Sequence, residues 1–238
     1  MAVKTMVFID GNWLYKSRSA VFAKLNEPNG FEIDYRKLPS VMCEDVANYL
    51  NLDVDNVRTV YFGTIPSQRS GFNTGKQNSF YNFLETSCGY ETNIHEVEIN
   101  GSEPRNDESW VVAALSSSLL YYAAVGAYDI AVVLGQDENY APALRHARLL
   151  GKRIQIVGAQ TAPDGKGDSA QNQVLAKPKV ADFPPIFIEN HAEAIRLVRE
   201  AQMRTCRECG SMEETTWAGP EFFCSKCRSR HRPAEQGD

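Results

Sequence analysis

The sequence contains no hydrophobic run long enough to cross a membrane. Of its 238 residues 43% are hydrophobic, yet no uninterrupted apolar stretch reaches the roughly 20 residues of a transmembrane helix. The first residues, Met1–Lys4, pass directly into a strand-like segment without a signal-peptide cleavage pattern. We therefore expect a cytoplasmic protein with no membrane partner.

An excess of positive charge is also missing. The chain has 25 Lys and Arg residues against 30 Asp and Glu residues, which gives a net charge of −5. This balance argues against binding of a polyanion by overall charge, so contact with a nucleic acid would require a local basic strip. The sequence has no internal repeat, P-loop or Asp-x-Asp nucleophile after the first strand. The last two absences argue against a phosphatase or another phosphoryl-transfer enzyme.

Strand-like and helix-like segments alternate along most of the chain. The expected strands are apolar and β-branched runs at 4–10, 57–63, 90–99, 130–134 and 153–157, with a short edge strand at 185–188. The first expected helix begins at Asn12, and five more cover 34–50, 77–88, 107–125, 141–150 and 192–203. This order predicts an α/β fold with a doubly wound, mainly parallel sheet, in which ligands bind at the carboxyl ends of the strands.

Acidic residues stand where such a sheet binds its ligands. Asp10 and Asp137 follow two apolar strands, and Asp107 opens the helix after the third strand. Carboxylates brought together are costly unless they share a proton or a cation, and hard oxygen ligands suit one or two Mg²⁺ or Mn²⁺ ions. Asn12 and Asn139 can orient water or hold a phosphate oxygen. We predict that these five residues form a catalytic metal site.

Each of these residues also has an ordinary structural role. An aspartate after a strand is often a helix N-cap, and Asp107 with Glu108 suits a helix start. Asn12 and Asn139 equally suit caps or turns. The set as a whole favours the functional interpretation, because neither strand end has a structural need for so many acids and amides.

Three segments resemble the motifs of the NYN (LabA-like) domains, a branch of the PIN-like ribonuclease superfamily. Val7–Tyr15 is similar to the opening motif, and Arg105–Glu108 stands where the second acidic position is found. Leu134–Pro142 is similar to the third motif, but Gly135–Gln136 replaces its Ser-Gly and Asn139 replaces its second aspartate.

The resemblance covers residues 3–190 and implies an activity. A family member is expected to be a metal-dependent endoribonuclease, with Asp10, Asp107 and Asp137 holding Mg²⁺ or Mn²⁺ that activates water, and Asn12 as a supporting polar group. The missing carboxylate of the third motif favours an alternative, a catalytically weak or inactive RNA-binding or scaffolding module.

Basic residues near the acids are candidates for contacts with the phosphates of single-stranded RNA. Arg69 and Lys76 follow the second expected strand, and Arg105 lies beside the second acidic position. Arg145 and Arg148 share a helix face but are less favoured, since polar loops at the carboxyl edge carry function more often. A solvated surface charge is the ordinary role of all five.

Two aromatic residues adjoin the acidic motifs. Trp13 follows the first motif and Tyr140 lies in the third. Proteins that bind single strands stack bases on such rings, so both are candidates for base contacts. Core packing is the alternative, and we expect it for at least one of them.

Four of the six cysteines form two Cys-x-x-Cys pairs near the C-terminus. Cys206 and Cys209 form the first pair, and Cys224 and Cys227 form the second. Two thiolate pairs on tight turns predict a structural zinc ribbon with tetrahedral geometry, whose metal drives the folding of a segment too short for its own core. A redox dithiol or an iron–sulfur cluster suits this spacing less well.

The predicted organisation has four parts. Residues 1–190 form the α/β domain, 191–204 a connecting helix, 205–232 the zinc ribbon and 233–238 a disordered tail. The ribbon and its basic run Arg228–Arg232 could contact RNA or a protein partner, or the basic run could serve only solubility. A homodimer is also compatible with the sequence.

Overall fold

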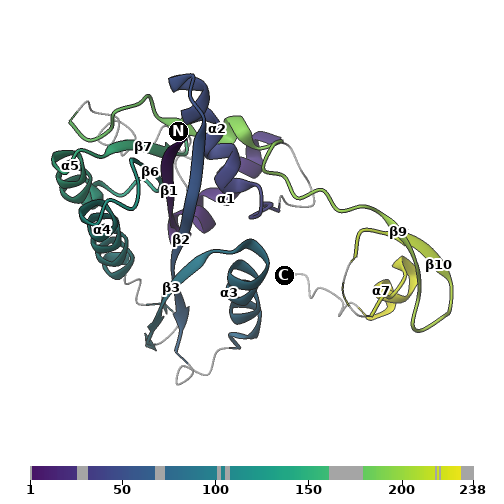
Figure 1. The fold of residues 1–238 in the computed structure, drawn as a ribbon. Helices are drawn as coiled ribbons and strands as arrows, with labels where there is room; N and C mark the ends of the chain where they lie inside the picture. The colour runs from purple at the N-terminus through teal and green to yellow at the C-terminus, as the bar shows by residue number, and fades with distance from the viewer. Residues whose placement is uncertain are drawn as a thin grey trace. The chain divides into compact units, whose positions relative to one another are not determined.

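A six-stranded sheet forms the centre of the first of two units, Met1–Arg196, and Leu197–Asp238 forms the second (Figure 1). The computed structural model describes residues 2–25, 32–67, 73–100, 103–104, 108–160, 179–217, 219 and 221–231. No helix in these ranges is both long and apolar enough to cross a membrane.

The strands of the sheet follow the order β3-β2-β1-β6-β7-β8, and every neighbouring pair is parallel. They are β1 (Val3–Asp10), β2 (Val54–Pro66), β3 (Glu91–Val97), β6 (Ile130–Leu134), β7 (Arg153–Gly158) and β8 (Ile186–Phe187). The central strands β1 and β6 are almost continuously buried, as expected for parallel strands covered on both faces. The predicted doubly wound α/β fold is confirmed.

Helices cover both faces of the sheet (Figure 1). They are α1 (Gly11–Leu25), α2 (Leu38–Leu50), α3 (Gly75–Cys88), α4 (Glu108–Ala124) and α5 (Ala141–Leu149). Short 3₁₀ turns η2 (Glu138–Tyr140) and η3 (Ile188–His191) follow β6 and β8, and β4 (Ile99–Asn100) pairs with β5 (Glu103–Pro104). Gly89 ends α3 in the left-handed conformation at φ 71°, in agreement with the sequence pattern.

Two hydrophobic layers hold the helices on the sheet. In β1, Val7 and Ile9 contribute to the layer under α1, α2 and α3, whereas Met6 and Phe8 contribute to the layer under α4 and α5. This alternation follows from the two-residue period of a strand. Asp10 continues the series of Met6 and Phe8, so its side chain belongs to the α4 and α5 face.

The predicted connecting helix at 191–204 is wrong. Residues 192–195 form a turn, Arg196 makes a β-bridge with Ile33, and a strand begins at Gln202. Ala192 and Ile195 are buried in the core of the first unit, so the local apolar spacing that suggested a helix arises from tertiary packing. The predicted tail at 233–238 lies outside the described residues.

The second unit is built on a small β-ribbon. Strands β9 (Gln202–Thr205) and β10 (Met212–Thr215) are antiparallel, and α7 (Ser225–His231) follows them. Its buried apolar cluster consists of Phe222 and three cysteines, with Phe223 packed against it. So small a core agrees with the expectation that a metal is needed for stability.

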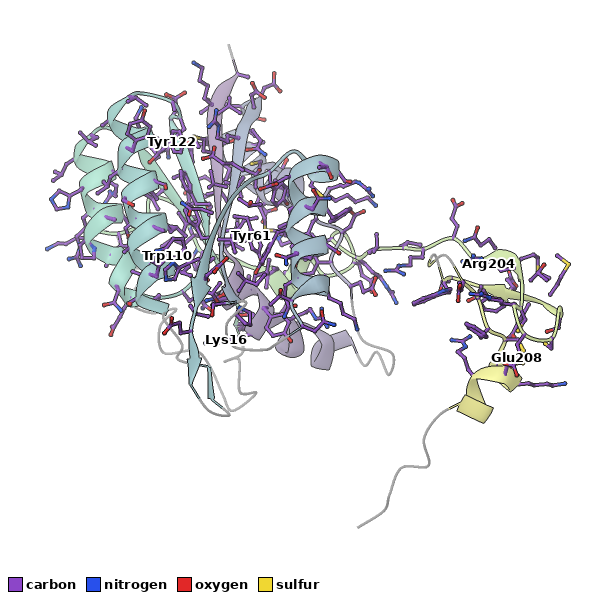
Figure 2. The ribbon with its side chains drawn as sticks, turned by 90° about the horizontal axis from the view of Figure 1, so that it is seen from below. Lys16, Tyr61, Trp110, Tyr122, Arg204 and Glu208 are labelled. Carbon is purple, nitrogen blue, oxygen red and sulfur yellow. The ribbon has the colours of Figure 1, made fainter. Side chains whose placement is uncertain are left out.

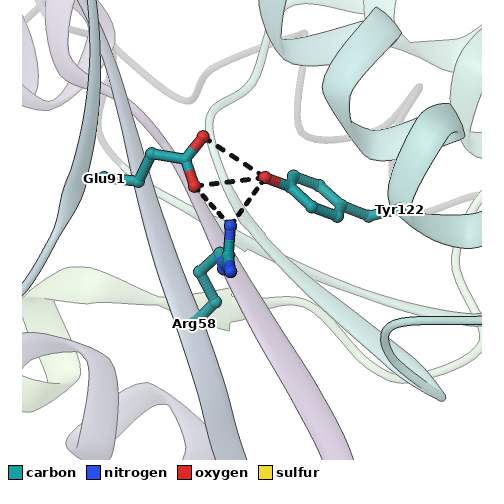
Figure 3. A network of polar contacts seen from close by, with 3 residues as sticks. All are labelled: Arg58, Glu91 and Tyr122. Carbon is teal, nitrogen blue, oxygen red and sulfur yellow. Dashed lines mark hydrogen bonds and ion pairs between the residues drawn. The ribbon is translucent and has the colours of Figure 1, made fainter.

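Two polar contacts attach α4 and α5 to the sheet. At the surface, Arg58 donates to Glu91 Oε2 at 2.7 Å and to the Tyr122 hydroxyl at 2.9 Å (Figure 3). Closer to the core, the Arg148 guanidinium donates from Nε and Nη2 to the Asp182 carboxylate, at 2.8–3.0 Å. The Asp182 side chain is 19% exposed against 47% for Glu91, so the second contact is less screened by water.

The exposure of these two ion pairs predicts different contributions to stability. Asp182→Asn should lower the free energy of unfolding by about 2 kcal/mol, because Arg148 and the backbone N–H of Ile154 lose a charged acceptor. Glu91→Gln should lower it by less than about 1 kcal/mol. Urea denaturation measures both, and equal effects would contradict this difference in screening.

Candidate active site and cysteine cluster

The carboxyl ends of β1 and β6 place Asp10 and Asp137 at the same edge of the sheet. The two strands are neighbours, with Ile9 opposite Leu134. Asp10 is the last residue of β1 and is 7% exposed, and Asp137 lies three residues beyond β6, partly exposed. Asp137 is close enough for its charge to raise the pKa of Asp10. This edge is where parallel α/β sheets bind ligands.

The Asp10 carboxylate receives hydrogen bonds from α1 and from the turn η2. Oδ1 accepts from the backbone N–H of Trp13 at 2.9 Å, so Asp10 caps α1. Oδ2 accepts from the hydroxyl of Tyr140 at 2.6 Å. The N-cap role is therefore compatible with the predicted site role, since a carboxylate has more lone pairs than these bonds use.

Burial raises the pKa of Asp10 above its ordinary value of 3.8. Hydrogen bonds from Trp13, Tyr140 and the backbone of Asn12 act in the opposite direction, and repulsion from Asp137 adds to the rise. The folded protein therefore holds a carboxylate that its surroundings only partly compensate. A bound cation would supply the missing compensation.

Asn139 holds Asp137 in place. Its backbone N–H and its side-chain Nδ2 both donate to Asp137 Oδ1 at 2.8 Å, and Asp137 caps the turn η2. The carboxylate that the third motif usually has here could not donate the second of these bonds. In this chain the position therefore orients the preceding aspartate.

Trp13 and Tyr140 are both buried, which confirms core packing and leaves neither candidate ring open for stacking on a base. Trp13 is 8% exposed and Tyr140 is fully buried. Trp13 Nε1 donates to Gln136 Oε1 at 2.9 Å, and Gln136 Nε2 donates to the carbonyl of Ala159 at 3.0 Å. This chain of bonds ties the first turn of α1 to the ends of β6 and β7. In the sequence, this chain of hydrogen bonds is signalled only by Trp13, an aromatic residue with an N–H donor near Asp10.

Two glycines allow the close packing around Asp10. A Cβ atom at Gly11 would collide with the ring of Tyr61. One at Gly135 would lie 3.2 Å from both Asp10 Cβ and Tyr140 Cε2. The side chains packed over these positions therefore leave no space for a Cβ atom at Gly11 and little at Gly135.

The remaining predicted site residues are placed only in part. Asn12 is half-buried and accepts a hydrogen bond from the hydroxyl of Thr64 at 3.3 Å. Lys76 is exposed in the first turn of α3. Three further residues, Asp107, Arg69 and Arg105, lie outside the described residues.

The less favoured arginines divide into two environments. Arg148 forms the ion pair with Asp182 described above, whereas Arg145 is exposed on α5. The paired guanidinium of Arg148 attaches α5 to the segment after β7. This contact gives Arg148 a structural role.

The four cysteines near the C-terminus form a cluster suited to zinc. Their Sγ atoms lie within 4.8 Å of one another, and those of Cys209 and Cys224 are 3.6 Å apart. Tetrahedral Zn–S bonds of about 2.3 Å place ligand sulfurs about 3.8 Å apart. Within the described part of the chain this is the single group of three or more residues suited to hold a metal. The predicted cluster Cys206, Cys209, Cys224 and Cys227 is thus confirmed as a group.

Backbone hydrogen bonds favour a thiolate in this cluster. The N–H groups of Cys209 and Cys224 lower the pKa of Cys206 to about 6, and the Cys224 bond measures 3.2 Å. A thiolate is the form that binds zinc. Donor type, spacing and charge therefore all fit a structural zinc ion.

Asp10→Asn is expected to stabilise the metal-free protein at neutral pH. Folding raises the pKa of Asp10 above its ordinary value of 3.8. The carboxyl therefore contributes stability at pH values below 3.8, and this contribution is lost as the pH rises through the raised pKa. The advantage of the variant should therefore grow with pH above 3.8 and disappear below it. Urea unfolding in EDTA across this range measures it, and equal stability at neutral pH would contradict a raised pKa.

Removal of zinc is expected to unfold the second unit alone. Cys224→Ser should abolish zinc binding in metal analysis and make 202–231 sensitive to proteases, because metal binding is folding energy in so small a unit. Cys88→Ser, at an isolated and partly buried cysteine, serves as the control. Full protease resistance of zinc-free protein would contradict a structural metal.

Comparison with known proteins places the chain in a family. The NYN domain matches residues 4–175. No curated protein matches the chain. A protein of unknown function, VPA0982 from Vibrio parahaemolyticus RIMD 2210633, has a similar crystal structure, with 14% identity and a TM-score of 0.51 over 82% of this chain and 97% of that one. Since the NYN match covers well over half of its length, the chain belongs to the NYN domain family, whose fold is that of PIN-like nucleases.

Proposed function

We propose that this NYN protein is a metal-dependent endoribonuclease that cleaves single-stranded RNA. The observation that carries the proposal is the buried carboxylate of Asp10, held by Trp13 and Tyr140 at the carboxyl edge of the sheet and close to Asp137. A buried carboxylate with an acidic neighbour at this edge is costly to the fold and useful to a metal enzyme.

The donor set fits Mg²⁺ or Mn²⁺. Asp10 and Asp137 offer hard oxygen ligands, and Asp107 is the third acid that the family motif assigns. When bound, the ion supplies an activated water and neutralises charge at the phosphodiester. The electrostatic repulsion between the two aspartates supports such an ion, since a cation relieves it.

The chain's own residues would orient the reaction. Tyr140 and the first turn of α1 fix the Asp10 carboxylate, and Asn139 fixes that of Asp137. Asn12, held by Thr64, is positioned to orient water or a phosphate oxygen. Fixed ligands of this kind need little reorganisation during the reaction.

Contacts with the RNA backbone would come from basic residues near this edge. Lys76 is exposed at the start of α3, and Arg69 and Arg105 come from the adjoining segments of the sequence. These charges would offset the repulsion between phosphates and an acidic protein.

The amide at Asn139 supports a second candidate, an RNA-binding or scaffolding module of low activity. Asn139 donates two bonds to Asp137 and brings no charge of its own. A site with one carboxylate fewer binds a second divalent ion less well. RNA binding without cleavage would favour this alternative.

Asp10→Ala is expected to reduce Mn²⁺-dependent cleavage of single-stranded RNA by more than about 100-fold, because even outer partners of metal ligands cost about 10- to 100-fold. Asp53→Asn, an exposed aspartate just before β2 at the opposite end of the sheet, is the matched control and should cleave like the parent. Gel assays with Mn²⁺ or EDTA measure the rates. The nuclease proposal would be wrong if Asp10→Ala cleaved RNA as fast as the parent, or if the parent cleaved no RNA at all.

Asn139→Asp tests the weakened half of the site in the same assay. A gain in activity or in Mn²⁺ affinity would identify a site limited by its missing carboxylate. A loss would indicate that the Asn139 amide is needed to orient Asp137. A gain would thus support a catalytically weak module, a loss would support a nuclease that uses Asn139, and no cleavage by either protein would support an inactive module.

A further inference from the structure

His95 and Trp110 form a parallel aromatic stack. Their ring centroids are 4.6 Å apart and their planes differ by 10°. Phe8 and Tyr128 in the core meet instead at 70°, edge to face, which is the other arrangement that aromatic pairs favour. A parallel pair presents flat ring surfaces, which is the geometry that a nucleobase extends by stacking.

The pair is only half-buried. His95 lies on β3, the edge strand of the sheet, and Trp110 lies in the first turn of α4. Both residues keep exposed surface, unlike Trp13 and Tyr140, which are buried beside the acids. Figure 2 shows Trp110 and Tyr122 at opposite ends of α4. Both residues of the pair therefore keep part of their surface open to solvent, at the end of α4 that follows the second acidic motif.

Strand register places the stack near Asp10. Asp10 lies opposite Phe62 on β2, and Thr64, two residues further on, lies opposite His95 on β3. Two strand spacings of about 4.8 Å and two residue rises of about 3.3 Å put the Cα atoms of Asp10 and His95 about 12 Å apart. The Trp110 contact shows that the His95 ring lies on the α4 face, which is also the face of Asp10.

The charge of the site makes such a platform useful. Phosphates are repelled by Asp10 and Asp137, and the chain as a whole is acidic. Stacking is insensitive to this repulsion and tolerates any base, so it can hold a strand next to an acidic centre. The spacing suits a base at or close in sequence to the scissile phosphate.

We propose that the His95–Trp110 stack is a nucleobase-binding subsite that holds single-stranded RNA beside the acidic site. This inference rests on the proposed ribonuclease function and adds a contact that the acids do not supply. Trp110 also packs against the core layer under α4, so a purely structural pair is the alternative that an experiment must separate.

The test measures binding of a fluorescent oligouridylate to the full chain carrying Asp10→Asn, so that cleavage does not interfere. Trp110→Leu, which keeps apolar packing but removes the flat ring, should weaken binding about tenfold. Tyr121→Leu is the matched control, an exposed aromatic residue (63%) at the other end of the same helix, and should not change the affinity.

Oligonucleotides with one abasic position distinguish stacking from structure. One such position should weaken binding to the Trp110-containing protein about tenfold and have no further effect on Trp110→Leu. If Trp110→Leu does not fold, the same binding comparison is made between His95→Leu and the protein that keeps both rings. The inference would be overturned if an abasic position weakened binding equally in the proteins with and without the stack. It would also be overturned if the variant bound the oligonucleotide with unchanged affinity, or if no protein bound it.

The two proposals fail in different assays. Binding through the stack without metal-dependent cleavage by the parent would keep the subsite and end the nuclease proposal. Cleavage by the parent with unchanged affinity in Trp110→Leu would do the reverse. If Trp110→Leu raises the KM for cleavage and leaves kcat unchanged, both proposals are supported.

Discussion

The burial of one carboxylate, Asp10, is the constraint on which the rest of the first unit depends. Taking this group out of water costs free energy, and the N–H of Trp13 and the hydroxyl of Tyr140 compensate only in part, since its pKa stays raised. Local instability of this kind is common where a fold prepares a site for a ligand. A cation at Asp10 would convert the same feature into stability on binding.

The hydrogen bonds around this carboxylate form a continuous network. Trp13 donates to Gln136, which in turn donates to Ala159, so the network spans the ends of three strands. Buried polar groups are costly when one hydrogen-bond partner is missing. Each side chain of the network therefore holds the next one in its position. The result is a rigid support for Asp10 and, through Tyr140, for the turn that carries the second acid.

Much of the fold follows from local patterns, but the site follows only in part. Apolar runs such as Ile130–Leu134 identify parallel strands, and strand ends then locate Asp10 and Asp137. The segment Ala192–Met203 has helical spacing but is shaped by contacts with distant residues, which no local pattern contains. Core packing could be expected for at least one of Trp13 and Tyr140, but not for both, because the burial of both depends on the pairing of β1 with β6.

The strand order also has a consequence for synthesis on the ribosome. Asp10 and Tyr140 are 130 residues apart, and β1 lies between β2 and β6. A nascent chain can pair β1 with β2 early, but the backbone groups along the other edge of β1 stay unpaired until β6 has emerged. An apolar strand with an unpaired edge is prone to aggregate, so the interval before β6 appears is the period in which we expect this protein to need a chaperone most.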